Sequence, residues 1–296
     1  MDLPVAGPTV AAAAVPSAAP FALLRPARQT APLAFASPHS GRDYPADFIA
    51  SARLAPIELR RSEDSFVDEL FAAAPSFGAP LLAATFPRAF CDANREPFEL
   101  DPAMFEDELP AWVNTASPRV GAGLGTLARI VSSGEPIYRG KLRFAEAERR
   151  VRQCWEPYHG ALTELIAATR AAFGAALLID CHSMPAGCCG DRLTADFVLG
   201  DAHGTACSPD VTRRIEQWLT QRGYAVRRND PYAGGYITRH YGQPRDHIHA
   251  VQIEISRALY MDESRIERSP SFAATEADMA RLIACLATEA AFLLGR

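Results

Sequence analysis

The stretch Leu178-Ile179-Asp180-Cys181-His182-Ser183 decides the fold class of this chain, because an apolar run that begins at Ala175 breaks into polar residues there. A second apolar run, over 31–37, leads in the same way into Ser37-Pro38-His39-Ser40-Gly41. Short apolar runs of this kind predict buried strands of an α/β sheet, and the carboxyl ends of such strands carry ligands and catalytic groups. The sequence therefore predicts two strands that each deliver a histidine to one edge of a sheet.

Further segments extend this pattern along the chain. We predict additional strands over 81–90, 195–199, 224–227 and 250–255. We predict helices over 65–74, over 144–173 with an interruption near Pro157, over 209–221 and over 273–294, and a long glycine-rich loop region over 112–139. Strands that alternate with helices predict a three-layer α/β sandwich with a mixed, mostly parallel central sheet, formed by one domain over 31–296.

Composition narrows the class of protein. A formal net charge of −5 argues against a nucleic-acid binder, and no stretch approaches the ~20 apolar residues of a membrane span. The seven cysteines are odd in number and lack paired C-x-x-C spacings, which favours reduced thiols and a cytoplasmic protein. The Ala/Pro-rich segment 1–30 is predicted to be a disordered tail, since an acidic residue and prolines interrupt any secretory-signal pattern.

His39 and His182 form the strongest candidate pair for a metal site. Neutral imidazole is the commonest zinc ligand, and a catalytic zinc needs three protein ligands with one position left open. Glu63 and Asp64 are the nearest carboxylates that could complete the set, although capping of the predicted helix that follows explains them about as well. A thiolate site built from cysteines 181, 188 and 189 is the alternative metal centre.

Glu254 is a carboxylate inside an apolar strand, Val251-Gln252-Ile253-Glu254-Ile255. Burial of a carboxylate costs several kcal/mol unless it is paired or ligated. The functional interpretation is a general base with a raised pKa; the structural alternatives are exposure on an edge strand or pairing with Arg257. Arginines near predicted strand ends or in glycine-rich loops would suit an anionic substrate, and these are Arg88, Arg95 beside Asn94, Arg139 and Arg239.

Six motifs in this order resemble the N-formylglutamate amidohydrolase family. They are Ser37-Pro38-His39-Ser40-Gly41-Arg42-Asp43-Tyr44-Pro45, Asp92-Ala93-Asn94-Arg95, Ile137-Tyr138-Arg139-Gly140-Lys141, Asp180-Cys181-His182-Ser183-Met184-Pro185, Asp230-Pro231-Tyr232-Ala233-Gly234-Gly235-Tyr236-Ile237-Thr238-Arg239-His240-Tyr241-Gly242 and Gln252-Ile253-Glu254-Ile255-Ser256-Arg257. The resemblance covers nearly the whole chain, over 31–290. It implies a phosphorylase/hydrolase-like sandwich, similar to that of the zinc carboxypeptidases.

The resemblance also implies a metal site. In the carboxypeptidases a glutamate three residues after the first histidine is a ligand, whereas here Arg42 stands at that place. The carboxylate must therefore come from elsewhere, and we expect one zinc ion per chain bound by His39, Asp64 and His182, with Glu63 as the second choice.

The activity implied is hydrolysis of N-formyl-L-glutamate, a small anionic amino-acid derivative, to formate and glutamate, as in histidine degradation. Glu254 is expected to act as general base toward the zinc-activated water, and Arg88 or Arg139 to stabilise the oxyanion. The residues expected to bind the substrate are Asn94, Arg95, Arg239 and Tyr236. The alternatives are hydrolysis of another N-acyl amino acid or short peptide, a non-catalytic binder of acidic amino acids, and a thiol enzyme that uses Cys181.

Overall fold

The computed structural model describes residues 19–187 and 195–295, and within these residues a central sheet of seven strands organises the chain. The strands are β1 (Phe21–Leu24), β2 (Leu33–Ser37), β3 (Leu81–Ala84), β4 (Ala176–Met184), β5 (Phe197–Gly200), β6 (Val226–Arg228) and β7 (Ile248–Ser256). Their spatial order is β1-β3-β2-β4-β7-β5-β6. Strands β3, β2, β4 and β7 run parallel, and so do β5 and β6, while β1 and the β5–β7 pair are antiparallel. The predicted mixed, mostly parallel sheet is confirmed.

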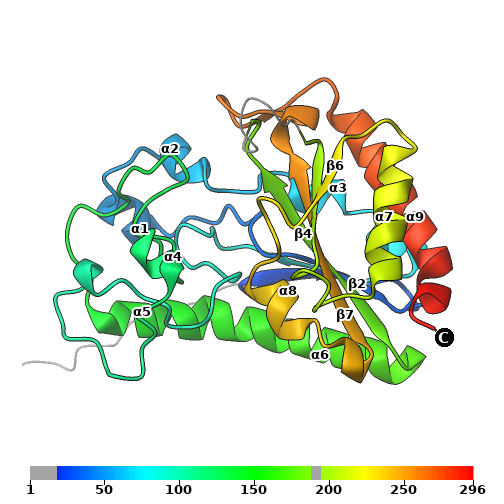
Figure 1. Cartoon of the computed structure of the whole chain (residues 1–296). Helices are drawn as coiled ribbons and strands as arrows, with labels where there is room; N and C mark the ends of the chain where they lie inside the picture. The colour runs from blue at the N-terminus through cyan, green and yellow to red at the C-terminus, as the bar shows by residue number, and fades with distance from the viewer. Residues whose placement is uncertain (1–18, 188–194, 296) are drawn as a thin grey trace, which may run out of the picture.

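The helices are α1 (Ala46–Ser51), α2 (Pro56–Arg60), α3 (Val67–Leu70), α4 (Pro118–Gly121), α5 (Phe144–Arg150), α6 (Glu156–Phe173), α7 (Pro209–Thr220), α8 (Tyr236–Tyr241) and α9 (Phe272–Leu293). Three of these helices cover the faces of the sheet, α6 on one face and α7 and α9 on the other, while α1, α2 and α4 lie to one side of it (Figure 1). A π-helical turn, Val151–Trp155, joins α5 to α6, and 3₁₀ turns lie at Ala74–Phe77, Pro102–Met104, Pro244–Asp246 and Arg257–Leu259. A separate hairpin pairs β8 (Met261–Asp262) with β9 (Glu267–Arg268).

Alternating side chains of the central strands build two apolar cores. Phe35 and Ile179 point to one face, where they pack with residues of α7 and α9. Ala36 and Leu178 point to the opposite face, where they pack with residues of α6 such as Leu162. Successive residues of a strand face opposite sides of the sheet, so these fully buried strands are apolar at nearly every position. The resulting three layers confirm the predicted sandwich.

Two predicted bounds at the amino-terminal side are wrong. Ordered structure begins before residue 31, because Phe21 in β1 pairs with Ala84 in β3, so the predicted disordered tail is too long; residues 1–18 lie outside the described part. The strand predicted over 81–90 ends at Ala84, and the chain then turns at Pro87, whose carbonyl accepts a hydrogen bond from Phe90. Apolar composition alone does not mark where pairing stops.

Three further expectations need correction. The helix predicted over 65–74 is reduced to the four residues of α3, whose start is set by Phe66 in the left-handed region at φ 68°. The interruption near Pro157 is a π-helical turn, so the path stays helical from 144 to 173. Strand β4 continues past Asp180 to Met184, because β7 pairs with it throughout, and His182 therefore lies inside the strand. None of the helices in the described ranges is long and apolar enough to span a membrane.

Candidate active site

The carboxyl ends of the parallel strands gather the polar residues that the sequence singles out. His39 follows β2 by two residues, His182 lies near the end of β4, and Asp64 lies in the loop before α3. The Asp64 backbone N–H donates to the His39 carbonyl at 3.0 Å, which ties the two loops together. Gly41 allows the close approach of the next loop, because a Cβ there would lie 2.1 Å from the Phe86 carbonyl oxygen. Local backbone contacts therefore bring ligands from separate segments to one point.

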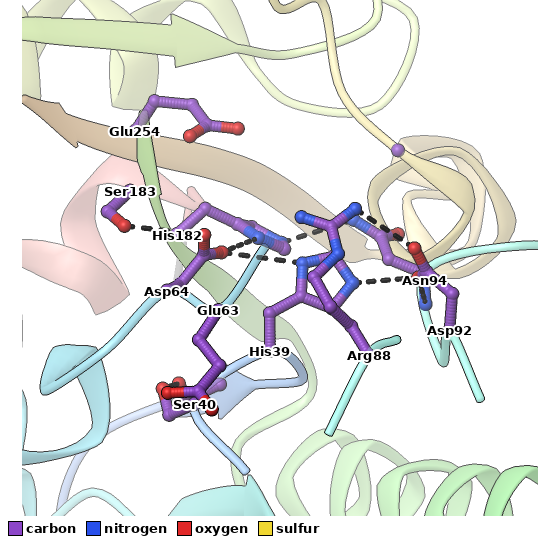
Figure 2. A network of polar contacts seen from close by, with 12 residues as sticks. His39, Ser40, Glu63, Asp64, Arg88, Asp92, Asn94, His182, Ser183 and Glu254 are labelled. Atoms are coloured by element: carbon purple, nitrogen blue, oxygen red, sulfur yellow. Dashed lines mark hydrogen bonds and ion pairs between the residues drawn. The ribbon is translucent and has the colours of Figure 1, made fainter. Parts of the chain in front are cut away.

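His39, Asp64 and His182 form one buried cluster (Figure 2). One nitrogen or carboxylate oxygen from each lies within 4.8 Å of the others. The Asp64 Oδ2 atom lies 3.3 Å from His39 Nδ1 and 2.9 Å from His182 Nδ1. Ligand atoms at about 2.1 Å from a tetrahedral zinc ion are separated by about 3.4 Å, so these spacings suit such an ion.

Two further carboxylates lie behind the imidazoles. His39 Nε2 is 2.7 Å from Asp92 Oδ1, and His182 Nε2 is 2.9 Å from Asp180 Oδ1. A carboxylate accepts hydrogen bonds, so it favours a proton on Nε2 and leaves each Nδ1 lone pair directed toward Asp64. This is the arrangement in which a histidine binds a metal through Nδ1.

The charges of the cluster favour a cation. Burial opposes ionisation of Asp64, but the two imidazoles outweigh it and hold the pKa of Asp64 well below its usual range. Burial likewise opposes the charged form of His182, but Asp180 above all raises the pKa of His182 well above its ordinary value. His39 Nδ1 is buried and lacks a hydrogen-bond partner among the described residues. Two imidazoles and a carboxylate match the donors that zinc prefers, so the residues present fit this metal.

Asp64, and not Glu63, is the carboxylate that faces the histidines. Arg257 Nη2 and Ser183 Oγ donate to Asp64 Oδ1 at 3.2 and 3.3 Å, which leaves Oδ2 for the imidazoles. Glu63 points away from the two rings in Figure 2, toward Ser40. Its carboxylate accepts from Tyr44, Arg60 and Ser65 instead.

Glu254 is buried in the interior of the sheet, because β7 lies between β4 and β5. This placement excludes exposure on an edge strand. Glu254 is the register partner of His182, and paired residues of neighbouring strands point to the same face, so both line the same cavity. Gln252 Nε2 donates to Glu254 Oε1 at 2.7 Å, whereas Arg257 contacts Asp64 and is not its partner. Burial raises the pKa of Glu254 to about 8.

A cavity of about 490 Å³ opens beside the cluster and includes most of the predicted substrate-binding residues. Arg88 lines it and donates to Asp92 Oδ2 at 2.9 Å. Asn94 also lines it; its Oδ1 accepts from the Ile237 N–H at 2.8 Å, and its Nδ2 lies 3.1 Å from His182 Nε2. Gly235 makes room for Asn94, since a Cβ there would lie 2.2 Å from Nδ2. Arg95 and Arg239 complete the predicted residues at the cavity wall.

The helical path from α5 to α6 fixes the loop that carries these residues. Arg150 donates to the Phe90 carbonyl at 3.0 Å, Trp155 Nε1 to the Arg95 carbonyl at 3.0 Å, and His159 Nε2 lies 2.8 Å from the Ala93 carbonyl. Trp155 ends the π-helical turn, and π-helical turns occur often at functional sites. The turn thus sets the position of the loop that supplies Asp92, Asn94 and Arg95.

Three predicted candidates lie elsewhere. Arg139 is exposed, does not line the cavity, and donates to the Ala52 carbonyl at 2.7 Å. The Tyr236 ring packs against Trp155 and His240, outside the residues that line the cavity. Cys181 points to the opposite face of β4 from His182, into the apolar core, where burial raises the thiol pKa well above its ordinary value. A thiol nucleophile is therefore not supported; Cys188 and Cys189 lie outside the described residues.

Several residues of the site were missed by sequence reasoning. Asp180 precedes His182 by two residues, and residues i and i+2 of a strand share a face, so this spacing could have revealed it. Asp92 was quoted as part of a motif, but no role was predicted for it. The clamp from Arg257 to Asp64 joins residues 193 positions apart and has no local signal in the sequence.

Substitution of Asp92 by asparagine is expected to weaken zinc binding by about 10–100-fold, because partners behind a metal ligand orient it and raise its basicity. The amide oxygen of the new side chain could still accept a hydrogen bond from His39, but the negative charge would be lost. Competition with a fluorescent chelator measures the affinity. Asp101→Asn, at a carboxylate that pairs with Arg129 outside the cavity, is the control. Unchanged affinity in Asp92→Asn would contradict this role.

The sequence of this chain is similar to those of known proteins from one family. A model of the N-formylglutamate amidohydrolase family matches residues 31–261. An N-formylglutamate deformylase of Pseudomonas putida is 32% identical over 238 residues, which cover 79% of this chain and 83% of the relative. That of Pseudomonas aeruginosa is 34% identical over 243 residues, covering 80% and 84%.

Two solved structures are also similar to this chain. The crystal structure of an N-formylglutamate amidohydrolase from Ralstonia eutropha JMP134 is 41% identical, with a TM-score of 0.87 over 92% of this chain and 98% of its own. A gene product of Agrobacterium tumefaciens, 18% identical with a TM-score of 0.64, shares the fold over 92% of this chain and 96% of its own.

Proposed function

The chain belongs to the N-formylglutamate amidohydrolase family. We propose that it hydrolyses N-formyl-L-glutamate to formate and L-glutamate, with one zinc ion held by His39, Asp64 and His182. The observation that carries the proposal is the buried cluster of two Nδ1 atoms and a carboxylate oxygen, with Glu254 on the same face of the sheet. The predicted cytoplasmic location and a role in histidine degradation stay predictions.

Zinc bound there would supply Lewis acidity, which lowers the pKa of a coordinated water and polarises the formyl oxygen. Glu254 would accept the proton of the attacking water at a carboxylate oxygen and later deliver it to the leaving amide nitrogen. Arg88, whose guanidinium is oriented by Asp92, would donate to the oxygen that becomes negative, a contribution of about 3 kcal/mol. The C–N bond breaks, and one water molecule is consumed for each formate and glutamate released.

The charge of the cavity wall supports an anionic substrate. Five arginines line the cavity: Arg88, Arg95, Arg119, Arg239 and Arg257. Arg88 pairs with Asp92 and Arg257 with Asp64, whereas the other three have no carboxylate partner among the described residues. A small molecule with carboxylates of its own would neutralise these charges.

Formate release from N-formyl-L-glutamate, compared with acyl release from N-acetyl- and N-succinyl-L-glutamate, tests the substrate. We expect the formyl compound to have the highest kcat/KM. Preference for a larger acyl group would instead support the alternative of a deacylase for another N-acyl amino acid. A short peptide ending in glutamate in the same panel tests carboxypeptidase-like activity.

The pH profile should show the titration of Glu254. A general base must be ionised, so activity falls as the pH drops through its pKa. Burial raises the pKa of Glu254 to about 8 from an ordinary value of 4.5, and a neighbouring divalent cation would lower it again. We therefore expect kcat/KM to rise with pH through an apparent pKa between these values. Zinc content is measured at each pH to exclude metal loss, and an unchanged acid limb in Glu254→Gln would contradict the assignment.

A further inference from the structure

Among the described residues that line the cavity, Arg119 is the one arginine that the sequence analysis did not single out. It lies in α4, is half-buried, and lines the cavity together with Leu124 and Arg95. Within the described ranges its side chain has neither an ion-pair nor a hydrogen-bond partner. A half-buried guanidinium without a carboxylate is costly to keep, because its charge is partly removed from water and not compensated. Its place at a cavity wall points to a ligand as the missing partner.

The side chain of Arg95 and the backbone of Arg119 are both hydrogen-bonded to the backbone of Leu124. Arg95 Nε donates to the Leu124 carbonyl at 2.8 Å, and the Leu124 N–H donates to the Arg119 carbonyl at 2.8 Å. Arg95 Nη1 is bound to the Asn94 carbonyl at 2.8 Å. Arg95 is thus fixed by carbonyls alone, and its Nη2 is not used in any hydrogen bond to the described residues.

Arg95 and Arg119 line the same cavity, and their positive charges oppose each other. Burial lowers the pKa of Arg95, and the positive charges of Arg88 and Arg119 lower it further, although Asp92 opposes them. Two like charges on one wall destabilise each other unless an anion lies between them. A carboxylate can accept from two guanidinium groups at once, since its two oxygens offer about four lone-pair sites.

Arg88 and Arg119 differ in how they are connected to the metal cluster. Arg88 contacts Asp92, which contacts His39 directly. Among the described residues Arg119, by contrast, is hydrogen-bonded through its backbone alone: its N–H donates to Ser117 Oγ at 3.1 Å and its carbonyl accepts from the Leu124 N–H at 2.8 Å. Its guanidinium therefore stays available for a substrate group that takes no part in the reaction at the metal cluster. In an N-acylated acidic amino acid the side-chain carboxylate is such a group, and it is separated from the scissile amide by more bonds than the α-carboxylate is.

We propose that Arg119, together with Arg95, binds the side-chain carboxylate of the substrate and so selects an acidic over an amide side chain. This inference rests on the proposed function, because it names the subsite of the same cavity that reads the side chain. Arg239, in α8, remains for the α-carboxylate. The subsite predicts that the enzyme distinguishes N-formyl-L-glutamate from N-formyl-L-glutamine by charge.

The test compares Arg119→Ala and Arg119→Lys with the wild type on these two substrates. We expect Arg119→Ala to lower kcat/KM for N-formyl-L-glutamate by about 10–100-fold, mainly through KM, because a charge-assisted hydrogen bond is lost. The value for N-formyl-L-glutamine should stay within about threefold, and Arg119→Lys should restore part of the selectivity. Arg129→Ala is the matched control, since Arg129 lies in the same segment but pairs with Asp101 outside the cavity.

A binding measurement separates this inference from the proposed reaction. Calorimetric titration of the zinc-loaded wild type with L-glutamate and L-glutamine should show tighter binding of glutamate, and Arg119→Ala should remove most of the difference. If the preference is present and depends on Arg119 but no formate is released, the proposed reaction is wrong and the subsite stands. Equal binding of the two amino acids by the wild type, or an equal loss for both substrates in Arg119→Ala, would overturn the subsite.

Discussion

Replacement of Glu254 by glutamine is expected to lower kcat by about a thousand-fold while zinc binding and KM change little, because general-base catalysis contributes about 10²–10⁴-fold. The amide keeps the shape of the side chain and can still contact Gln252, but it cannot take a proton from water. Steady-state kinetics with N-formyl-L-glutamate measures the loss, and metal analysis of the same sample verifies that the centre is intact.

Glu108→Gln serves as the control for this experiment, since Glu108 is exposed and lies outside the cavity. Turnover by Glu254→Gln within about tenfold of the wild type would show that another group accepts the proton. The fold should tolerate the substitution, because a buried neutral amide replaces a carboxyl group that burial already disfavours in its charged form.

Replacement of Asp64 by asparagine is also expected to abolish activity, in this case because the bound zinc is lost. Asp64 Oδ2 lies between the two Nδ1 atoms, and loss of its charge removes one of three ligands. We expect the bound zinc to fall from about one ion per chain to a small fraction, and activity to fall to background. Mass spectrometry of the metal after dialysis measures the content.

Glu63→Gln provides a matched control, because Glu63 is the neighbouring residue and is equally buried. Its carboxylate is engaged by Tyr44, Arg60 and Ser65, so its loss should lower the melting temperature but leave the zinc content unchanged. The opposite result, with zinc lost in Glu63→Gln and retained in Asp64→Asn, would reverse the ligand assignment. Thermal unfolding of both variants separates a metal effect from a failure to fold.

The pattern of apolar residues was sufficient to predict the sheet and its class. Buried parallel strands such as β2 and β4 are apolar on both faces, and this produces the short runs that identify them. The predicted ends of the strands were less accurate. Strand β4 extends through His182 because β7 continues to pair with it, and β7 lies about 70 residues further along the chain. Local sequence does not contain that information.

Residues of the candidate site could be predicted only where a polar side chain stands within or beside an apolar strand. His39, His182 and Glu254 stood out because each is polar within or beside an apolar strand, and the structure brings them to one face of the sheet. Arg139 was proposed from its place in a glycine-rich region and Tyr236 from a motif, and neither lines the cavity, because neither signal shows the direction of a side chain. Arg119 was missed since α4 lies in an irregular segment without periodicity.

Metal-dependent hydrolysis of N-formyl-L-glutamate can be tested in one experiment that removes the metal from the protein and then restores it. Formate release is measured for the purified protein, after removal of metal with a chelator, and after addition of one equivalent of zinc. We expect release that is lost on chelation and restored by zinc in the wild type but not in Asp64→Asn. Release that persists at full rate in metal-free protein, or no release from the zinc-loaded protein, would contradict it.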